Sequence, residues 1–260
     1  MLDREAASMS KPNQVLLKTL EEKQSNLSPH FPLAKEIKED FIHWAKVELT
    51  YHSNTIEGNT LTKGETAELL DRGLNAVINK PLKDQIEALN HEKAMTYTLH
   101  LSDQYTSHQY ISEDNIKEIN RLVLNDMSDW AGIYRRTIVH VGGSNYERPH
   151  YDQVPSLMRE LVDYLKYNQD GHPIKIAADV HTTLLGIHPF LDGNGRTARL
   201  LMNLILLIHK FPVSIIKSED RIRYFESLET SFLSKDRADL YDIIFSSVNR
   251  SLDEMTKYFE

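Results

Sequence analysis

The chain has 260 residues and a net charge of −8, from 30 Lys and Arg against 38 Asp and Glu, without a basic block, so we expect no nucleic-acid partner. It contains no cysteine, which excludes disulfides and a thiolate nucleophile and fits a reducing compartment. Because its first residues lack the pattern of a signal peptide and its longest apolar run is too short to span a bilayer, we expect a cytoplasmic protein with no membrane partner.

The first part of the chain is predicted to be helical after a polar lead-in. Residues 1–35 are polar and interrupted by prolines, which indicates an arm with a short helix around residues 15–23. From residue 36, apolar side chains recur every three or four positions, which predicts one long helix over residues 36–56. Gly58 is a natural left-handed stop for this helix.

The end of this helix carries two polar residues on one face. Ser53 and Glu57 are four positions apart, so they point the same way. A solvated carboxylate is the simplest interpretation of Glu57, but the helix dipole disfavours a carboxylate in a last turn, which weakens that interpretation without removing it. Shortly afterwards, Thr62 and Glu65 have the spacing of a capping box that opens the next helix, which Gly73 closes.

Apolar periodicity predicts helices through most of the remaining chain. They lie at residues 81–101, 113–125, 154–167, 173–187, 200–209, 219–231 and 237–259. Residues 200–207 are apolar almost all round, so we expect the helix that carries them, with Arg196 and Arg199 in its first turn, to be buried. His91 and His181 lie within this helical pattern, and we interpret both as buried packing or supporting residues.

Residues 131–144 are the one segment with β character. Ile138 and Val139 are β-branched, and the pair Gly142 and Gly143 is a turn signal. We therefore predict an all-α fold with one small β-hairpin.

The segment HPFLDGNGRTAR, residues 188–199, connects two predicted helices and carries most of the chemistry. Gly193 and Gly195 permit backbone angles that other residues resist, and a glycine-bearing loop that enters a helix directs free N–H groups at one point. Such a helix start binds anions. Arg196 and Arg199 lie in the first turn, where cations oppose the helix dipole, so a negative ligand is expected beside them.

Two further side chains add to this segment. His188 titrates near neutral pH and can accept a proton. A phosphate would repel Asp192 unless a cation joined them, and Mg²⁺ binds in this way, through one or two carboxylates and substrate phosphates. Each residue alone is compatible with an ordinary helix–loop–helix junction, but the combination indicates phosphoryl or nucleotidyl transfer.

The same segment resembles the signature of the Fic family, H-[PX]-F-x-[DE]-G-N-G-R-x-x-R, at every defined position. The matching residues are His188, Pro189, Phe190, Asp192, Gly193, Asn194, Gly195, Arg196 and Arg199. Members of this family usually transfer AMP from ATP to a protein hydroxyl. The related Doc kinases carry Ala and Lys where this sequence has Gly193 and Gly195, so the resemblance favours AMP transfer over phosphate transfer.

The resemblance implies a Fic-type helical bundle and a role for each matching residue. It makes the chain a protein adenylyltransferase that uses ATP and Mg²⁺, with His188 as general base and Asp192 as metal ligand. The residues implied in nucleotide binding are Gly193, Asn194, Gly195, Arg196, Arg199, Tyr224 and Phe225. The last two resemble an aromatic pair that lines the adenine pocket, although core packing would explain them equally well. Phe232 departs from the small polar residue that the family often has at its position.

Two other segments resemble family elements. Residues 53–58 match the inhibitory motif [ST]-x-x-x-E-[GN], beginning at Ser53, in which Glu57 would pair with Arg199 and keep that arginine from the γ-phosphate of ATP. The sequence A-G-x-Y-R before a G-G turn resembles the family flap, which docks a target segment by strand addition. The flap residues are Val141, Gly142, Gly143 and Ser144, and the partner is a target protein hydroxyl.

The resemblance also suggests how the chain is divided. It gives an N-terminal arm (1–35), a helical region with the inhibitory motif (36–109), the Fic domain (110–245) and the end of the C-terminal helix (246–260). Family members with an internal inhibitory helix are often dimers, so a homodimer is a further partner to test.

Two alternatives remain open from the sequence. Glu57 could position a water molecule that removes AMP from a modified protein, instead of or in addition to transfer. The chain could also be a non-catalytic module that binds nucleotide or peptide, although such a module has no need of His188.

Overall fold

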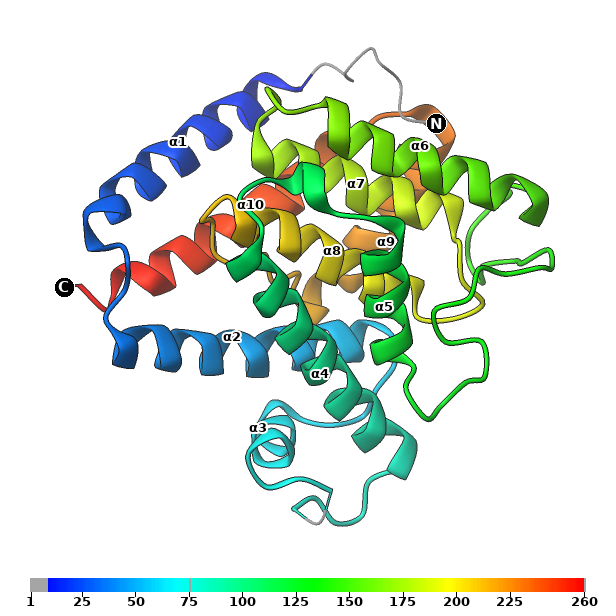
Figure 1. The fold of residues 1–260 in the computed structure, drawn as a ribbon, viewed down its shortest axis with the longest axis horizontal. Coiled ribbons are helices and arrows are strands. Elements are labelled where there is room, and N and C mark those ends of the chain that lie inside the picture. The colour runs from blue at the N-terminus through cyan, green and yellow to red at the C-terminus, as the bar shows by residue number, and fades with distance from the viewer. Residues whose placement is uncertain (1–8, 75, 260) are drawn as a thin grey trace.

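The computed structural model describes residues 9–74 and 76–259, and this part of the chain is mostly helical (Figure 1). Its α-helices are α1 (Lys11–Leu27), α2 (Lys35–Ile56), α3 (Lys63–Arg72), α4 (Leu82–Gln104), α5 (Glu113–Val123), α6 (Val154–Tyr167), α7 (Pro173–Ile187), α8 (Asn194–Ile208), α9 (Arg221–Ser234) and α10 (Ala238–Thr256). Short 3-10 turns are η1 (Ser28–His30), η2 (His108–Tyr110), η3 (Tyr151–Gln153) and η4 (Ser218–Asp220). The predicted helical class is confirmed.

Helix α8 is the central element of the bundle, with α7 packed along it and α4 and α5 across it (Figure 1). Within α8 only Gly195 and Leu207 are not fully buried, so the prediction of a buried helix is confirmed. Asn203 interrupts the apolar run, but its side chain donates to the Ser214 carbonyl at 3.1 Å and accepts from the Ser214 N–H at 2.6 Å. A buried amide that is satisfied in this way does not weaken the core.

The N-terminal segment is longer in helix than the sequence pattern indicated. Ser10 caps α1, with its hydroxyl accepting from the Asn13 N–H at 3.3 Å, and Pro12 occupies the first turn, where proline is tolerated. Helix α1 lies against α10, and Leu20 and Leu27 are buried in the main core. This segment therefore contributes to the core of the bundle.

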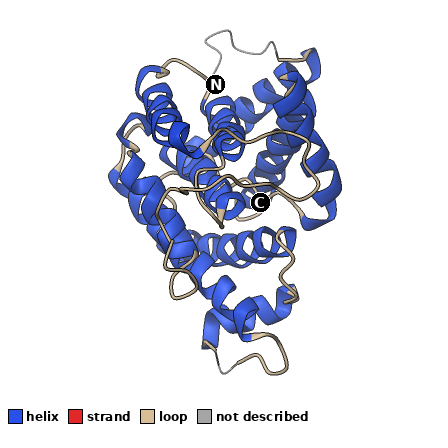
Figure 2. Ribbon diagram, turned by 90° about the vertical axis from the view of Figure 1, so that its right-hand side faces the viewer, coloured by secondary structure: helices blue, strands red, loops and turns tan. Residues whose placement is uncertain are grey.

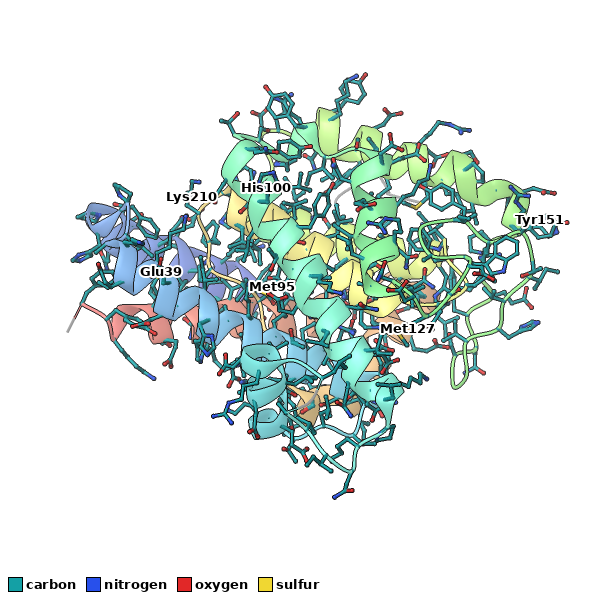
Figure 3. All side chains as sticks on the ribbon, turned by 60° about the horizontal axis from the view of Figure 1, so that its bottom comes forward. Glu39, Met95, His100, Met127, Tyr151 and Lys210 are labelled. Carbon is teal, nitrogen blue, oxygen red and sulfur yellow. The ribbon has the colours of Figure 1, made fainter. Side chains whose placement is uncertain are left out.

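Helices α2 and α4 cross one face of the bundle, and α3 lies beyond them (Figure 1). The predicted capping box between Thr62 and Glu65 is present at the start of α3, and Gly73 ends that helix at φ 78°. Side chains fill the spaces between these helices, with buried Met95 of α4 near the middle of the view in Figure 3. Among residues 9–74 and 76–259, no helix combines the length and apolar character needed to cross a membrane.

The predicted β-hairpin is not formed as paired strands. Residues 136–150 form a loop (Figure 2), in which the Ser144 N–H donates to the Val141 carbonyl at 3.1 Å and Gly143 has φ 79°. The prediction of a turn at Gly142 and Gly143 is therefore confirmed, but the residues on either side of the turn do not pair as strands.

The side chain of Arg135 joins the two arms of this loop in place of hydrogen bonds between paired strands. The guanidinium of Arg135 donates to the carbonyls of Thr137 and Pro149, at 2.8 and 2.6 Å, and so joins the two arms of the loop. Within the described ranges, the single β-bridge joins Tyr134 to Phe190 and attaches this loop to the segment between α7 and α8. The loop is thus held by a buried side chain, which hydrophobic patterning does not reveal.

Candidate active site

The segment between α7 and α8 has the backbone geometry of an anion site. His188 ends α7 in a left-handed conformation (φ 53°, ψ 60°), and Gly193 at φ 74° precedes α8. The side chain of Asn194 braces the turn, accepting from the Phe190 N–H at 3.0 Å and donating to the Phe190 carbonyl at 2.9 Å. The first N–H groups of α8 are therefore fixed in direction, as an anion-binding helix start requires. Asn194 is placed to hold this loop, with both polar atoms of its side chain already used.

Both arginines of the segment are buried, with 3% of Arg196 and 1% of Arg199 exposed. Arg196 lies 3.4 Å from Glu87 Oε1 and 3.8 Å from Asp192 Oδ1, yet its Nε and Nη1 find no hydrogen-bond partner in the described part of the chain. Nη1 of Arg199 is unpartnered in the same sense. Since an unpaired buried N–H of a cation costs free energy, these groups fit an anionic ligand such as the phosphates of ATP.

The carboxylate of Glu57 lies on this anion site. Glu57 directly follows α2, and its Oε1 accepts a hydrogen bond from Arg199 Nη2 at 2.7 Å. Ser53 binds the same guanidinium, because its hydroxyl accepts from Nε and its carbonyl from Nη2, both at 2.9 Å. A Cβ atom added to Gly195 would lie 2.2 Å from Glu57 Oε1. The predicted contact of Glu57 with Arg199 is therefore present, Ser53 adds to it, and together they cover the first turn of α8.

His188 is a neutral base at physiological pH. Burial lowers the pKa of its imidazole to about 4, and the charges of Arg148 and Arg135 act in the same direction. A hydrogen bond of the ring to the Leu185 backbone and the charge of Glu57 oppose this shift without cancelling it. An imidazole with this pKa is deprotonated at pH 7 and can accept a proton.

Asp192 is the acidic residue of the loop. Its side chain is 71% exposed, and Oδ1 accepts from the Gly193 N–H at 2.6 Å. Among the residues that the structure describes, no three His, Asp or Glu side chains are grouped so that they could hold a metal ion by themselves. A single carboxylate fits Mg²⁺ that is shared with the phosphates of a nucleotide.

The two aromatic residues predicted to line an adenine pocket have different environments. Tyr224 is fully buried, with its hydroxyl 2.9 Å from His181 Nε2, so the alternative of core packing describes it better. Phe225 is 39% exposed, and the guanidinium carbon of Arg221 lies 4.9 Å from its ring centroid. Phe225 therefore remains as an accessible aromatic surface.

The loop predicted to dock a target is anchored to α9. Glu229 accepts hydrogen bonds from the Ser144 hydroxyl and from the Asn145 N–H, each at 2.6 Å. Gly142 and Gly143 are exposed beside this anchor and form the tip of the loop, and Val141 is half-buried. The tip is thus fixed at one point while its backbone stays accessible.

Phe232, a residue of α9, packs against the same loop. The guanidinium carbon of Arg148 lies 4.8 Å from the centroid of Phe232 and 4.9 Å from that of Tyr146. The rings of Tyr146 and Phe232 are themselves 5.1 Å apart. An aromatic residue at position 232 therefore holds the arginine whose charge affects His188.

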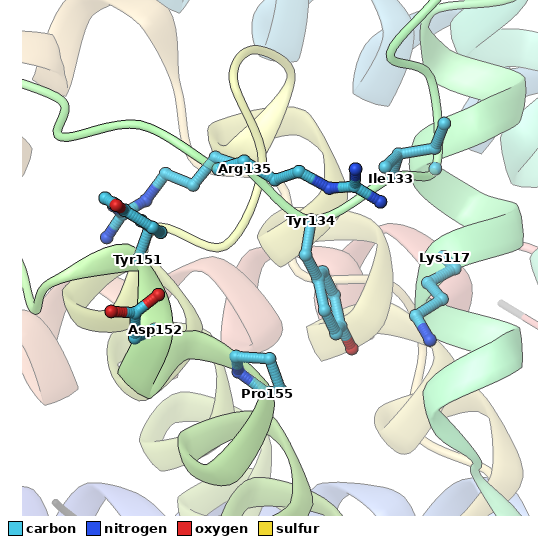
Figure 4. Close-up of a pocket in the computed structure, with 9 residues that line it drawn as sticks. Lys117, Ile133, Tyr134, Arg135, Tyr151, Asp152 and Pro155 are labelled. Atoms are coloured by element: carbon cyan, nitrogen blue, oxygen red, sulfur yellow. The ribbon is translucent and has the colours of Figure 1, made fainter.

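A pocket of about 640 Å³ opens between α5, residues 132–136 and the start of α6 (Figure 4). Tyr134 points into it between Lys117 and Pro155, and its hydroxyl donates to Glu113 at 2.9 Å. Because Tyr134 also forms the bridge to Phe190, the pocket adjoins the segment that carries His188.

Sequence reasoning missed residues that support the site from other helices. Asn120 of α5 is fully buried, donates to the Asp192 carbonyl at 3.1 Å and accepts from the Gly132 N–H at 2.9 Å. The available signal was a polar residue on the apolar face of an amphipathic helix, at a position where periodicity requires a core residue. His91 is buried as predicted, and burial, with the charges of Arg199 and Arg196, lowers its pKa to about 3.

Comparison with known proteins finds similarity to Fic proteins. The sequence profile of the Fic/DOC family matches residues 110–206. The protein adenylyltransferase Fic of Nematostella vectensis is 37% identical over 223 residues, which cover 83% of this chain and 50% of that protein. The protein adenylyltransferase fic-1 of Caenorhabditis elegans is 38% identical over 188 residues, covering 70% of this chain and 36% of that protein. The chain therefore spans half or less of the length of these curated relatives.

Solved structures share the fold. Residues 134–508 of Fic-1 from C. elegans superpose with a TM-score of 0.84 at 27% identity, covering 95% of this chain and 73% of that one. A Fic domain containing signaling protein from Bacteroides thetaiotaomicron superposes with a TM-score of 0.78 at 28% identity. The superposition covers 93% of this chain and 98% of that one.

Proposed function

The chain belongs to the Fic/DOC family, and from that premise we propose that it is a protein adenylyltransferase, which transfers AMP from ATP to a Ser, Thr or Tyr hydroxyl of a target protein. The observation that carries this proposal is the start of α8, where N–H groups of buried Arg196 and Arg199 have no hydrogen-bond partner among the described residues, on the same segment as a neutral His188. Buried guanidiniums of this kind suit a polyphosphate, and a neutral imidazole suits a general base.

In the proposed reaction, His188 accepts the proton of the target hydroxyl as the hydroxyl oxygen attacks the α-phosphorus of ATP. The bond from this oxygen to the α-phosphorus forms while the bond from the α-phosphorus to the β-bridging oxygen breaks. Pyrophosphate leaves with the bridging oxygen, and the proton remains on His188. A general base of this kind contributes about 10²- to 10⁴-fold to the rate.

The remaining residues bind and stabilise the nucleotide. The N–H group of Gly195, together with Arg196 and Arg199, opposes the negative charge of the phosphates, which is the larger contribution in such reactions. Asp192 would hold Mg²⁺ jointly with those phosphates, and the ion would supply further charge stabilisation. Phe225 offers the ring on which an adenine can stack.

We propose further that Glu57 inhibits this reaction. Its carboxylate uses the guanidinium that a γ-phosphate would need, and it lies over Gly195, where a phosphate would approach the helix. ATP that binds without Arg199 would present its α-phosphorus in the wrong direction for in-line attack. The exposed tip at Gly142 and Gly143 would receive the target segment through its backbone.

The test is intact-mass spectrometry of the purified chain after incubation with MgATP. Self-modification stands in for the unknown target, and the variants are Glu57→Gly, alone and combined with His188→Ala. An AMP-sized gain is expected on Glu57→Gly and not on the double variant. A phosphate-sized gain would contradict AMP transfer and assign a kinase activity. ATP binding without any gain, on every variant, would contradict catalysis and favour a binding module.

A second candidate function is removal of AMP from a modified protein. In the described part of the chain, Oε2 of Glu57 has no hydrogen-bond partner, and the side chain is 34% exposed, so this oxygen is free to hold an attacking water. If Glu57 has this role, the unmodified chain will remove AMP from the self-modified Glu57→Gly protein in a mixture. A modification that persists in that mixture would contradict the removal activity.

A further inference from the structure

The end of α2 is attached to its neighbours at two points beside Glu57. Asn59 donates through Nδ2 to the Asp84 carbonyl at 2.9 Å and to Glu87 Oε2 at 3.1 Å, which ties it to α4. Arg221, the first residue of α9, donates from Nε to the carbonyl of Ile56 at 2.8 Å. Ile56 is the last residue of α2, so Arg221 binds the carbonyl of the peptide unit that directly precedes Glu57.

A cation is well placed at this point. The last carbonyls of a helix have no partner within the helix, and the helix dipole favours positive charge there. Glu57 lies outside α2 at φ −85° and ψ 1°, and its own N–H donates to Asn54 at 3.0 Å. A last turn of this kind opens easily unless another element holds it.

We propose that Arg221 is a positioning residue for inhibition: it fixes the end of α2 so that the Glu57 carboxylate stays on Arg199. This inference rests on the proposed function of Glu57. Arg221 touches neither Glu57 nor Arg199 through any hydrogen bond in the described residues, so it acts through the backbone of Ile56.

The same guanidinium also connects the end of α2 with the nucleotide surface. Its carbon lies 4.9 Å from the ring centroid of Phe225, on which we place the adenine. A base that stacks on the face of Phe225 that Arg221 covers would displace this guanidinium.

Arg223 is a matched control on the same helix. It is two residues further on, is half exposed, and pairs with Asp242 of α10 at 2.7 Å, away from α2. Arg223→Ala removes the same side chain as Arg221→Ala without touching α2, whereas Arg221→Lys keeps a cation and a donor at the end of α2.

The activity test compares self-modification rates in two backgrounds. Arg221→Ala is expected to raise the rate about threefold to tenfold in the otherwise unchanged protein, as loss of a charged contact at a helix end allows. In the Glu57→Gly background, where there is no carboxylate to position, it should have no such effect. The measured quantity is the ratio of the two fold-changes. A ratio clearly above one, with Arg221→Lys and Arg223→Ala both near one, supports the proposal, and a ratio of one or less for Arg221→Ala overturns it.

Hydrogen exchange provides a readout that does not depend on transfer. In the full chain without nucleotide, Arg221→Ala should speed exchange of the amides of residues 57–59, and Arg223→Ala should not. Unchanged exchange at these amides would overturn the proposal even if the rates changed. If no variant transfers AMP, the proposed function fails, while the exchange result still decides whether Arg221 holds this turn.

Discussion

Replacing Glu57 with glycine is predicted to tighten ATP binding by at least about tenfold. In the present structure, Glu57 Oε1 lies 2.7 Å from Arg199 Nη2, and the arginine side chain is only 2% exposed. ATP can use Nη2 of this guanidinium only after the contact is broken. The binding free energy of ATP is therefore reduced by whatever the contact contributes.

The magnitude follows from the nature of this contact. A hydrogen bond to a charged group contributes about 1.5–3 kcal/mol, and each 1.4 kcal/mol is about a factor of ten in affinity. This corresponds to about 10- to 150-fold. The Glu57 side chain is 34% exposed, so solvent weakens the pair and favours the lower end of the range.

The assay is isothermal titration with MgATP, in a His188→Ala background so that ATP is not consumed. Glu57→Gln in the same background separates charge from size, because it keeps the side chain near Gly195 but removes the negative charge. We expect affinity in the order Glu57→Gly, then Glu57→Gln, then the unchanged residue. Affinities that agree within about twofold for all three would refute competition between Glu57 and the phosphates.

Three further predictions concern the loop between α7 and α8. With a pKa lowered to about 4, His188 is already neutral well below pH 7, so kcat/KM of the Glu57→Gly variant should stay nearly flat between pH 7.5 and 5.5; an ordinary histidine would lose about tenfold over this range, and such a loss would contradict the pKa shift. Phe190→Ala should lower the free energy of unfolding by about 3–5 kcal/mol in urea denaturation, because the ring is fully buried, and an unchanged midpoint would contradict its packing role. Asp192→Ala should raise the Mg²⁺ concentration needed for half-maximal transfer while leaving the melting temperature unchanged, since the side chain is 71% exposed; an unaltered Mg²⁺ titration would remove Asp192 as metal ligand.

Sequence patterns predicted the parts of the site that depend on neighbours along the chain. The spacing of Gly193 and Arg196 indicated a helix start that binds anions, and α8 begins at Asn194 with both features in place. The four-residue spacing of Ser53 and Glu57 indicated a shared face, and both residues bind Arg199. Such inferences succeed because helix periodicity and left-handed glycine angles act over only a few residues.

These local patterns did not predict contacts between segments that are distant in the sequence. Gly142 and Gly143 correctly indicated a turn, but strand pairing also requires free backbone groups on both arms, and Arg135 binds carbonyls on each arm. The adjacent aromatic residues Tyr224 and Phe225 could not be distinguished by sequence, because only the packing of α9 decides which ring is buried.

The sequence by itself determined the helical class, the ends of most helices and the chemistry of residues 188–199, because periodicity, capping and turn residues are local properties. Only the tertiary structure brings distant polar groups together, and the sequence indicated one such pair, Glu57 with Arg199, through the family resemblance alone. Arg199 and Glu57 are 142 positions apart, and Arg221 and Ile56 are 165 apart. Their contacts depend on how α2, α8 and α9 pack around one core, which is a property of the whole chain.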